Sequence, residues 1–268
     1  MRIDKIVIYP FMVFLVLLGL LELSGCTGNT EPEPAQGKIG FTFNHVVEGN
    51  PVVFDTMIYQ NAAGNQYLVN EIQYFVSDFT LWQNGHGLML DKWEDIHYVD
   101  TDIPDTWSYQ PADDIPEGSY DSLTFIFGIS EEKNQSFMFV NPPESFMFWP
   151  EYLGGGYHYM KLNGKWKDPE GIINPFNFHL GIGQIYDNDG NITGFIQNYF
   201  TVHLPGSSFT ISNGETTHAN ITMHINEWFN NPNIFDFNYW GGNIMENQAA
   251  MHSGIENGHN VFSIEFNR

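Results

Sequence analysis

Short stretches in which apolar and polar residues alternate recur through most of the chain, from residue 39 to residue 266. In the first, residues 39–47, apolar side chains and His45 occupy every second position. A period of two is typical of a β-strand that buries one face. Similar stretches lie at residues 67–81, 95–99, 119–127, 156–162, 176–180, 194–204, 218–225 and 260–266. Turn-forming pairs such as Asn84-Gly85 and Asp189-Gly190 separate them. The pattern predicts a mostly β protein, as a β-sandwich or a barrel-like antiparallel double sheet.

Helix is indicated in two places, both near the C-terminus. Residues 226–230 form a short candidate that Pro232 ends. Residues 244–255 place Met251 and Ile255 on one helical face, and Gly258 follows as a stop signal. With no internal repeat, residues 39–268 are expected to form one mostly β domain with one or two short C-terminal helices.

The N-terminus has the pattern of a lipoprotein signal peptide. Arg2 and Lys5 precede an apolar stretch, residues 6–21, which ends in Leu23-Ser24-Gly25-Cys26. This order supplies small residues before a cleavage site and a thiol that can carry a diacylglycerol. We predict that residues 1–25 are removed, that Cys26 is acylated, with palmitate among its chains, and that residues 26–38 form a tether. An ordinary signal peptide with a chance cysteine is the alternative.

The predicted export of the protein and its net charge limit the classes of function that it can have. The signal predicts a protein held by its lipid anchor in the cell envelope of a Gram-negative-type bacterium, in the periplasm or at the outer membrane. Cys26 is the only cysteine, so the core must hold the fold without a disulfide, and a chain with 16% aromatic residues can supply a large core. The net charge of −23 argues against nucleic acid as a partner, because nucleic acid selects basic surfaces.

Histidine is the residue type most informative about chemistry. All ten histidines lie within the expected domain. In an oxidising compartment without a free thiol, His and Met are the side chains that remain to hold copper. Alternation points His45 and His158 into the core, whereas His218 and His224 fall on a polar face. A buried neutral imidazole needs a partner on each nitrogen, which another polar group or a metal can provide. From the residues alone, a polar partner and a metal both remain open for these histidines.

Several blocks of the sequence resemble the MbnP-like family of copper-binding-type periplasmic proteins and lipoproteins. The matching blocks are residues 67–81 (YLVNEIQYFVSDFTL), 97–100 (HYVD), 115–129 (IPEGSYDSLTFIFGI), 147–150 (MFWP), 155–164 (GGYHYMKLNG) and 176–181 (FNFHLG). The last two blocks are the most specific part of the resemblance. The likeness extends over most of the chain from about residue 39 to residue 266.

The resemblance implies a β-sandwich-like domain that binds copper. In some members a tryptophan is oxidised to kynurenine by a partner dihaem enzyme of the MauG type. By this likeness His179 is the first candidate ligand. His45, His97 and His158 are added from alternation and from their places in the matching blocks. Trp149 is a possible modified or site-lining aromatic, although this chain has MFWPE at residues 147–151 where the family usually has Met-x-Trp-x-Trp.

The leading hypothesis is therefore a binding protein rather than an enzyme, which captures copper and stores it or passes it on. A glycan- or peptide-binding surface lipoprotein is the main alternative, because seven tryptophans and 13 tyrosines could stack on sugars. A hydrolase that uses pairs of Asp or Glu is a third possibility. Nucleophilic catalysis has no support, since no Gly-x-Ser-x-Gly motif occurs.

Overall fold

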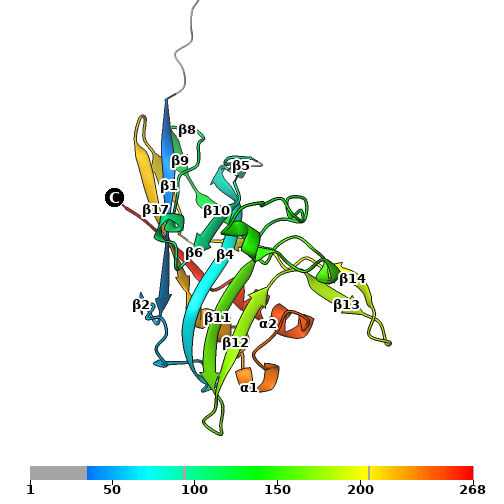
Figure 1. Cartoon of the computed structure of the whole chain (residues 1–268). Coiled ribbons are helices and arrows are strands. Elements are labelled where there is room, and N and C mark those ends of the chain that lie inside the picture. Colours follow the sequence, from blue (N-terminus) through cyan, green and yellow to red (C-terminus); the bar gives the residue numbers. More distant parts are fainter. Residues whose placement is uncertain (1–34, 93–94, 205, 268) are drawn as a thin grey trace, which may run out of the picture. The chain divides into compact units, whose positions relative to one another are not determined.

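The computed structural model describes residues 35–92, 95–204 and 206–267 (Figure 1). The predicted signal peptide, Cys26 and residues 27–34 of the predicted tether lie outside the described residues. The first strand, β1, begins at Gln36, ahead of the expected start of the domain at Ile39. The strand starts early because Gln36 and Gly37 already pair with Pro116 and Ile115.

Two sheets form the body of the domain. The first comprises, in order, β18 (Phe262–Phe266), β17 (Thr216–His224), β1 (Gln36–Val47) and β2 (Asn50–Pro51), with β7 (Ser108–Tyr109) and β8 (Ile115–Pro116) also paired to β1. The second comprises β12 (Ile173–Leu180), β11 (Met160–Lys167), β4 (Gln66–Gln83), β10 (Ser122–Phe127) and β15 (Phe200–His203), with β3 (Tyr59–Gln60), β5 (His86–Met89) and β6 (His97–Asp100) also paired to β4. Two further sheets have two strands each: β13 (Gly183–Tyr186) with β14 (Ile192–Ile196), and β9 (Gly118–Tyr120) with β16 (Phe209–Ile211). Among the named strands only β1 and β17 pair in parallel.

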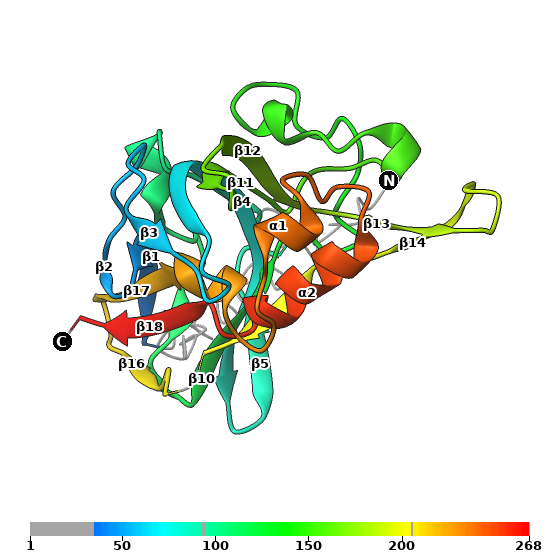
Figure 2. The ribbon, with the colours of Figure 1, turned by 90° about the horizontal axis from the view of Figure 1, so that it is seen from below.

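Helices are few and short. They are α1 (Phe237–Trp240), α2 (Gln248–Gly258) and the 3-10 turns η1 (Pro104–Trp107), η2 (Glu144–Met147), η3 (Glu151–Leu153) and η4 (Ile225–Phe229). The predicted helix at residues 244–255 begins later, at Gln248, because the Asn247 side chain accepts a hydrogen bond from the Ala250 amide and caps it. Figure 2 shows α1 and α2 next to each other. None of the helices in the described part of the chain has the length and apolar character to cross a lipid bilayer.

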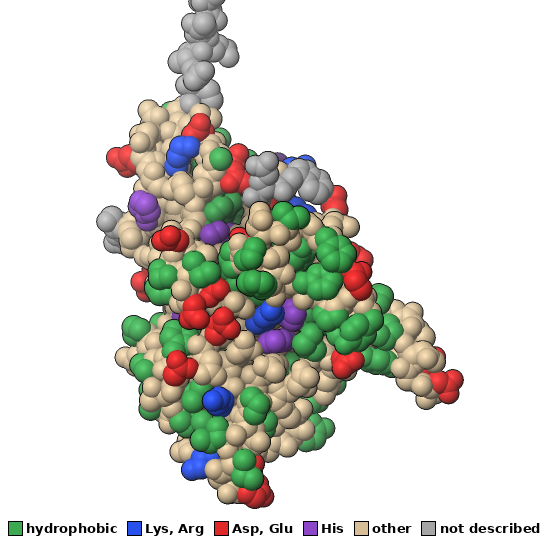
Figure 3. All heavy atoms as spheres, in the orientation of Figure 1, with side chains coloured by type: hydrophobic (Ala, Val, Ile, Leu, Met, Phe, Trp, Pro, Cys, Tyr) green, Lys and Arg blue, Asp and Glu red, His purple; other side chains and the backbone are tan. Residues whose placement is uncertain are grey.

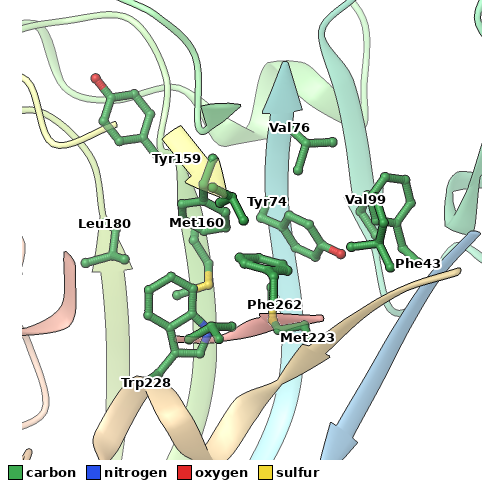
Figure 4. Packing of buried hydrophobic residues seen from close by; sticks show 14 of the residues in the cluster. Phe43, Tyr74, Val76, Val99, Tyr159, Met160, Leu180, Met223, Trp228 and Phe262 are labelled. Atoms are coloured by element: carbon green, nitrogen blue, oxygen red, sulfur yellow. The ribbon is translucent and has the colours of Figure 1, made fainter. Parts of the chain in front are cut away.

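Aromatic side chains from both sheets meet in one core. Phe41 of β1 stacks on Phe79 of β4 with ring centroids 4.5 Å apart, and Phe125 of β10 meets Phe262 of β18 at 5.4 Å. Figure 4 shows part of this core, in which Tyr74, Met160, Met223 and Phe262 from four strands lie near Trp228 of η4. The predicted fold class is confirmed as a mostly β sandwich, and the described strands form no closed barrel.

The opposite face of the second sheet is polar where β12, β11 and β4 run side by side. Lys161 lies opposite His179 on one neighbouring strand and opposite Gln73 on the other. Asn163 lies opposite Glu71, and a bulge follows directly after Asn163. Bulges often re-aim side chains beside functional sites. We call His179, Lys161, Asn163, Glu71 and Gln73 the polar stripe.

Candidate metal centre

The segment before β11 folds back on itself and brings Trp149 next to His158. The Trp149 amide donates to the Gly156 carbonyl at 2.8 Å, and the His158 amide donates to the Met147 carbonyl at 2.7 Å. The turn between these two stretches needs glycine, because Gly154, Gly155 and Gly156 all have positive φ. A Cβ atom on Gly156 would also lie only 2.6 Å from the Asn134 side-chain oxygen.

His158 and His179 form a pair at the end of β12. Their ring centroids lie 5.1 Å apart and the rings are nearly perpendicular, at 85°. His158 is 5% exposed and His179 is half-buried. The fully buried ring of Trp149 meets His158 edge-on, with centroids 4.6 Å apart. This arrangement requires glycine at position 181, because a Cβ atom there would lie only 2.6 Å from the Trp149 ring.

Hydrogen bonds fix the tautomer of each imidazole. Nδ1 of His158 lies 2.9 Å from the Met147 carbonyl oxygen, which can only accept, so Nδ1 carries the proton. Nε2 of His179 lies 2.8 Å from Oδ1 of Asn163. The amide nitrogen of Asn163 donates to Glu71 at 3.2 Å, which orients the amide so that its oxygen faces His179.

The other nitrogen of each ring is left with a lone pair. Nε2 of His158 and Nδ1 of His179 are buried and have no hydrogen-bond partner in the structure. A buried polar atom without a partner costs roughly 1–3 kcal/mol. Two such atoms on adjacent rings, each backed by an oxygen that holds the opposite nitrogen, match the way histidines are prepared as metal ligands.

The electrostatic surroundings keep both imidazoles neutral. Burial, followed by the neighbouring His179 and the charge of Lys161, holds the pKa of His158 well below its usual value. Burial and then the charge of Lys161 lower the pKa of His179 to about 3. Neutral imidazole is the form that binds metal, so neither ring has to lose a proton at neutral pH. The residues present therefore fit a metal ion that accepts nitrogen ligands.

His45 and His97, the other two predicted ligands, lie elsewhere. His45 is buried, as alternation predicted, and its Nε2 lies 3.2 Å from the Tyr74 hydroxyl. His97 approaches the Thr106 carbonyl at 2.8 Å. It also stacks on Phe43. The structure thus brings together His158, His179 and Trp149 from the predicted set, and gives His45 and His97 separate partners.

A cluster of carboxylates also lies near the polar stripe. Glu71, Asp100 and Asp102 are the only group of three or more His, Cys, Asp or Glu residues in the described part of the chain whose ligand atoms lie within 4.8 Å of one another. Asp100 is already engaged, because its carboxylate accepts hydrogen bonds from Tyr98 and Gln73. Asp102 is exposed. We assign no ion to this cluster.

Sequence reasoning missed the residues that support the histidine pair. Lys161 and Asn163 come from β11, Glu71 from β4, and Gly181 follows β12. Lys161 and Asn163 occupy polar positions that alternate with buried ones along the strand, and this alternation is visible in the sequence. Which strand faces those positions is set by pairing register, which the sequence does not reveal.

A sequence model of one family, MbnP, matches residues 36–248. The chain belongs to the MbnP family. Membership supports a metal-related role, and it confirms the family resemblance seen in the sequence. Among solved structures, MbnP from Methylosinus trichosporium is similar at 17% identity over 70% of this chain and 76% of that chain, with a TM-score of 0.45. Among curated proteins, none matches this chain by sequence.

Proposed function

We propose that this MbnP-family protein binds one copper ion between Nε2 of His158 and Nδ1 of His179. The observation that carries the proposal is the pair of buried, unpartnered imidazole nitrogens on rings 5.1 Å apart. The Met147 carbonyl and the Asn163 amide orient the two rings, and the buried ring of Trp149 packs edge-on against His158. The function is capture and release of the ion rather than catalysis.

Copper fits this donor set better than other common ions. Imidazole suits copper, zinc, iron and nickel, whereas magnesium and calcium prefer oxygen. Structural zinc sites almost always have four protein ligands. In the described residues no third His, Cys, Asp or Glu joins the pair within 4.8 Å. A site with two neutral imidazoles suits an ion that tolerates few ligands, as Cu(I) does.

We also propose that the loop carrying the site meets a partner protein, by family likeness a dihaem enzyme of the MauG type acting on Trp149. Large apolar side chains in this loop are exposed: Phe137 (67%), Val140 (79%), Phe146 (67%) and Tyr152 (67%). Figure 3 shows hydrophobic side chains gathered above and to the right of adjacent histidine and lysine side chains. Exposed apolar patches of this kind are typical of protein interfaces.

The envelope location belongs to the same proposal. A lipid on Cys26 would hold the copper site outside the cytoplasm, where copper enters and redox partners work. Replacement of Cys26 by Ser should move the protein from the membrane fraction to the soluble fraction of cells. Retention of the Cys26→Ser protein in the membrane fraction would contradict the lipid anchor.

The test of copper binding is a Cu(I) competition titration of the full-length protein, purified in detergent, against a chromogenic chelator. We expect one tight site that His158→Ala and His179→Ala each abolish. His218→Ala is the matched control, because His218 is exposed on β17. His45→Ala should also bind normally, since that ring is paired with Tyr74. A folded wild-type protein that fails to compete for Cu(I) would refute the proposal.

The glycan-binding alternative has less support. Stacking on sugars needs tryptophans that face solvent. Of the tryptophans that the structure describes, Trp149, Trp166 and Trp228 are buried, and Trp82, Trp107 and Trp240 are half-buried. No row of exposed tryptophans is therefore present in the described residues.

A further inference from the structure

Lys161 lies directly beside the histidine pair. Its Cα is the register partner of His179 across the β11–β12 ladder. Side chains directly opposite each other in such a ladder have Cβ atoms about 5 Å apart. The ammonium group donates to the Phe146 carbonyl at 2.5 Å, in the loop that also supplies the Met147 carbonyl for His158. The lysine is therefore anchored at the site rather than extended into solvent.

Among the described residues, neither imidazole of the pair has a carboxylate as its hydrogen-bond partner. His158 is bonded to a backbone carbonyl and His179 to an amide. Glu71 accepts a hydrogen bond from Asn163 and also acts electrostatically on Lys161. A metal ion between the rings would thus have two neutral ligands and a neighbouring cation.

We propose that Lys161 makes this site selective for a monovalent ion, Cu(I), over the divalent ions Cu(II) and Zn(II). The inference rests on the proposed copper site. The repulsion between the ammonium group and the bound ion scales with the charge of the ion, so a divalent ion is penalised twice as much. For one additional unit of charge at about 6 Å and an effective dielectric constant near 20, this penalty corresponds to roughly a hundredfold in affinity. Partial screening reduces it, so we expect about tenfold to a hundredfold.

The test compares Lys161→Met with Lys161→Arg and Lys165→Met in the full-length protein. Met removes the charge and keeps a long side chain, whereas Arg restores a permanent charge. Lys165→Met is the matched control: it makes the same change in net charge on the same strand, at an exposed position. It lies four residues away, roughly 13 Å along the strand. That separation exceeds the screening length of about 8 Å at physiological ionic strength.

Affinities for Cu(I), Cu(II) and Zn(II) are measured by competition, and the Cu(II)/Cu(I) potential by redox titration. We expect Lys161→Met to strengthen Cu(II) and Zn(II) binding about tenfold to a hundredfold relative to Cu(I). The potential should fall by about 59 mV for each tenfold change. Lys161→Arg and Lys165→Met should both behave like the wild type.

An unchanged ratio of Cu(I) to Cu(II) affinity in Lys161→Met would overturn the inference while leaving copper binding intact. If that unchanged ratio came with equal weakening of both ions, Lys161 would act only by holding the Phe146 loop in place. By contrast, a folded wild-type protein that binds no Cu(I) would refute the copper function itself, and this inference with it.

Discussion

A methyl group added at Gly181 would strike the ring of Trp149. Its Cβ would lie 2.6 Å from Cε3 and 2.7 Å from Cζ3 of that ring. Carbon atoms in favourable contact are about 3.5–4.0 Å apart, so the ring has to move by roughly 1 Å. Trp149 is fully buried and its Nε1 donates to the Leu153 carbonyl at 3.1 Å, so it cannot move freely. The displacement is passed to His158, which the ring contacts.

We expect Gly181→Ala to lower the free energy of unfolding by about 1–3 kcal/mol, the usual cost of overpacking. For a domain of this size each kcal/mol lowers Tm by about 2–4 °C, which gives a fall of roughly 2–12 °C. Because the displaced ring lies against His158, the variant should also bind Cu(I) more weakly than the wild type.

Thermal unfolding followed by circular dichroism tests this, with Gly194→Ala as the control. A Cβ on Gly194 would meet its nearest neighbour, Cδ1 of Ile185, at 3.4 Å, which is ordinary contact. That variant should stay within about 0.5 kcal/mol of the wild type. If Gly181→Ala matched the wild type in both Tm and Cu(I) affinity, the packing of Trp149 against Gly181 and its link to the site would be refuted.

Three further predictions concern the histidines and their supports. On folding, the pKa of His45 falls to about 4 and that of His179 to about 3. The contribution of these two neutral rings to stability is therefore complete above the unfolded pKa of 6.5, and it is lost as the pH falls from there through the folded values. Urea titrations should show a loss of about 1.4 kcal/mol per pH unit for each ring below pH 6.5. Cu(I) affinity should change little between pH 7 and pH 5.5, because the ligands are already neutral; a tenfold loss in competition assays over that range would contradict the lowered pKa values. Asn163→Leu should weaken Cu(I) binding about tenfold to a hundredfold by freeing His179, whereas equal weakening by the exposed Asn177→Leu would show that the effect is not specific.

Local patterns in the sequence predicted the fold class. Alternation over residues 216–224 follows directly from one buried and one exposed face of β17, and it correctly placed His218 in solvent. The same rule correctly predicted that His45 is buried. These properties depend on near neighbours in the chain, so a period of two is enough to read them. The family blocks added the expectation of a sandwich, which the structure confirms.

The candidate site depended on contacts between segments distant in the chain. Alternation grouped His158 with Met160, but residues 155–160 are all buried, so no period exists there. His158 reaches His179 because the chain folds back before β11 and because β12 pairs with β11 in one particular register. His97 resembled a ligand in the sequence, yet it packs between Phe43 and Tyr109. The sequence by itself determined which side chains could hold copper and that the chain is mostly β. Only the tertiary structure decided which two imidazoles lie next to each other, because strand register and turn geometry place a ring to within a few ångströms and residue type does not.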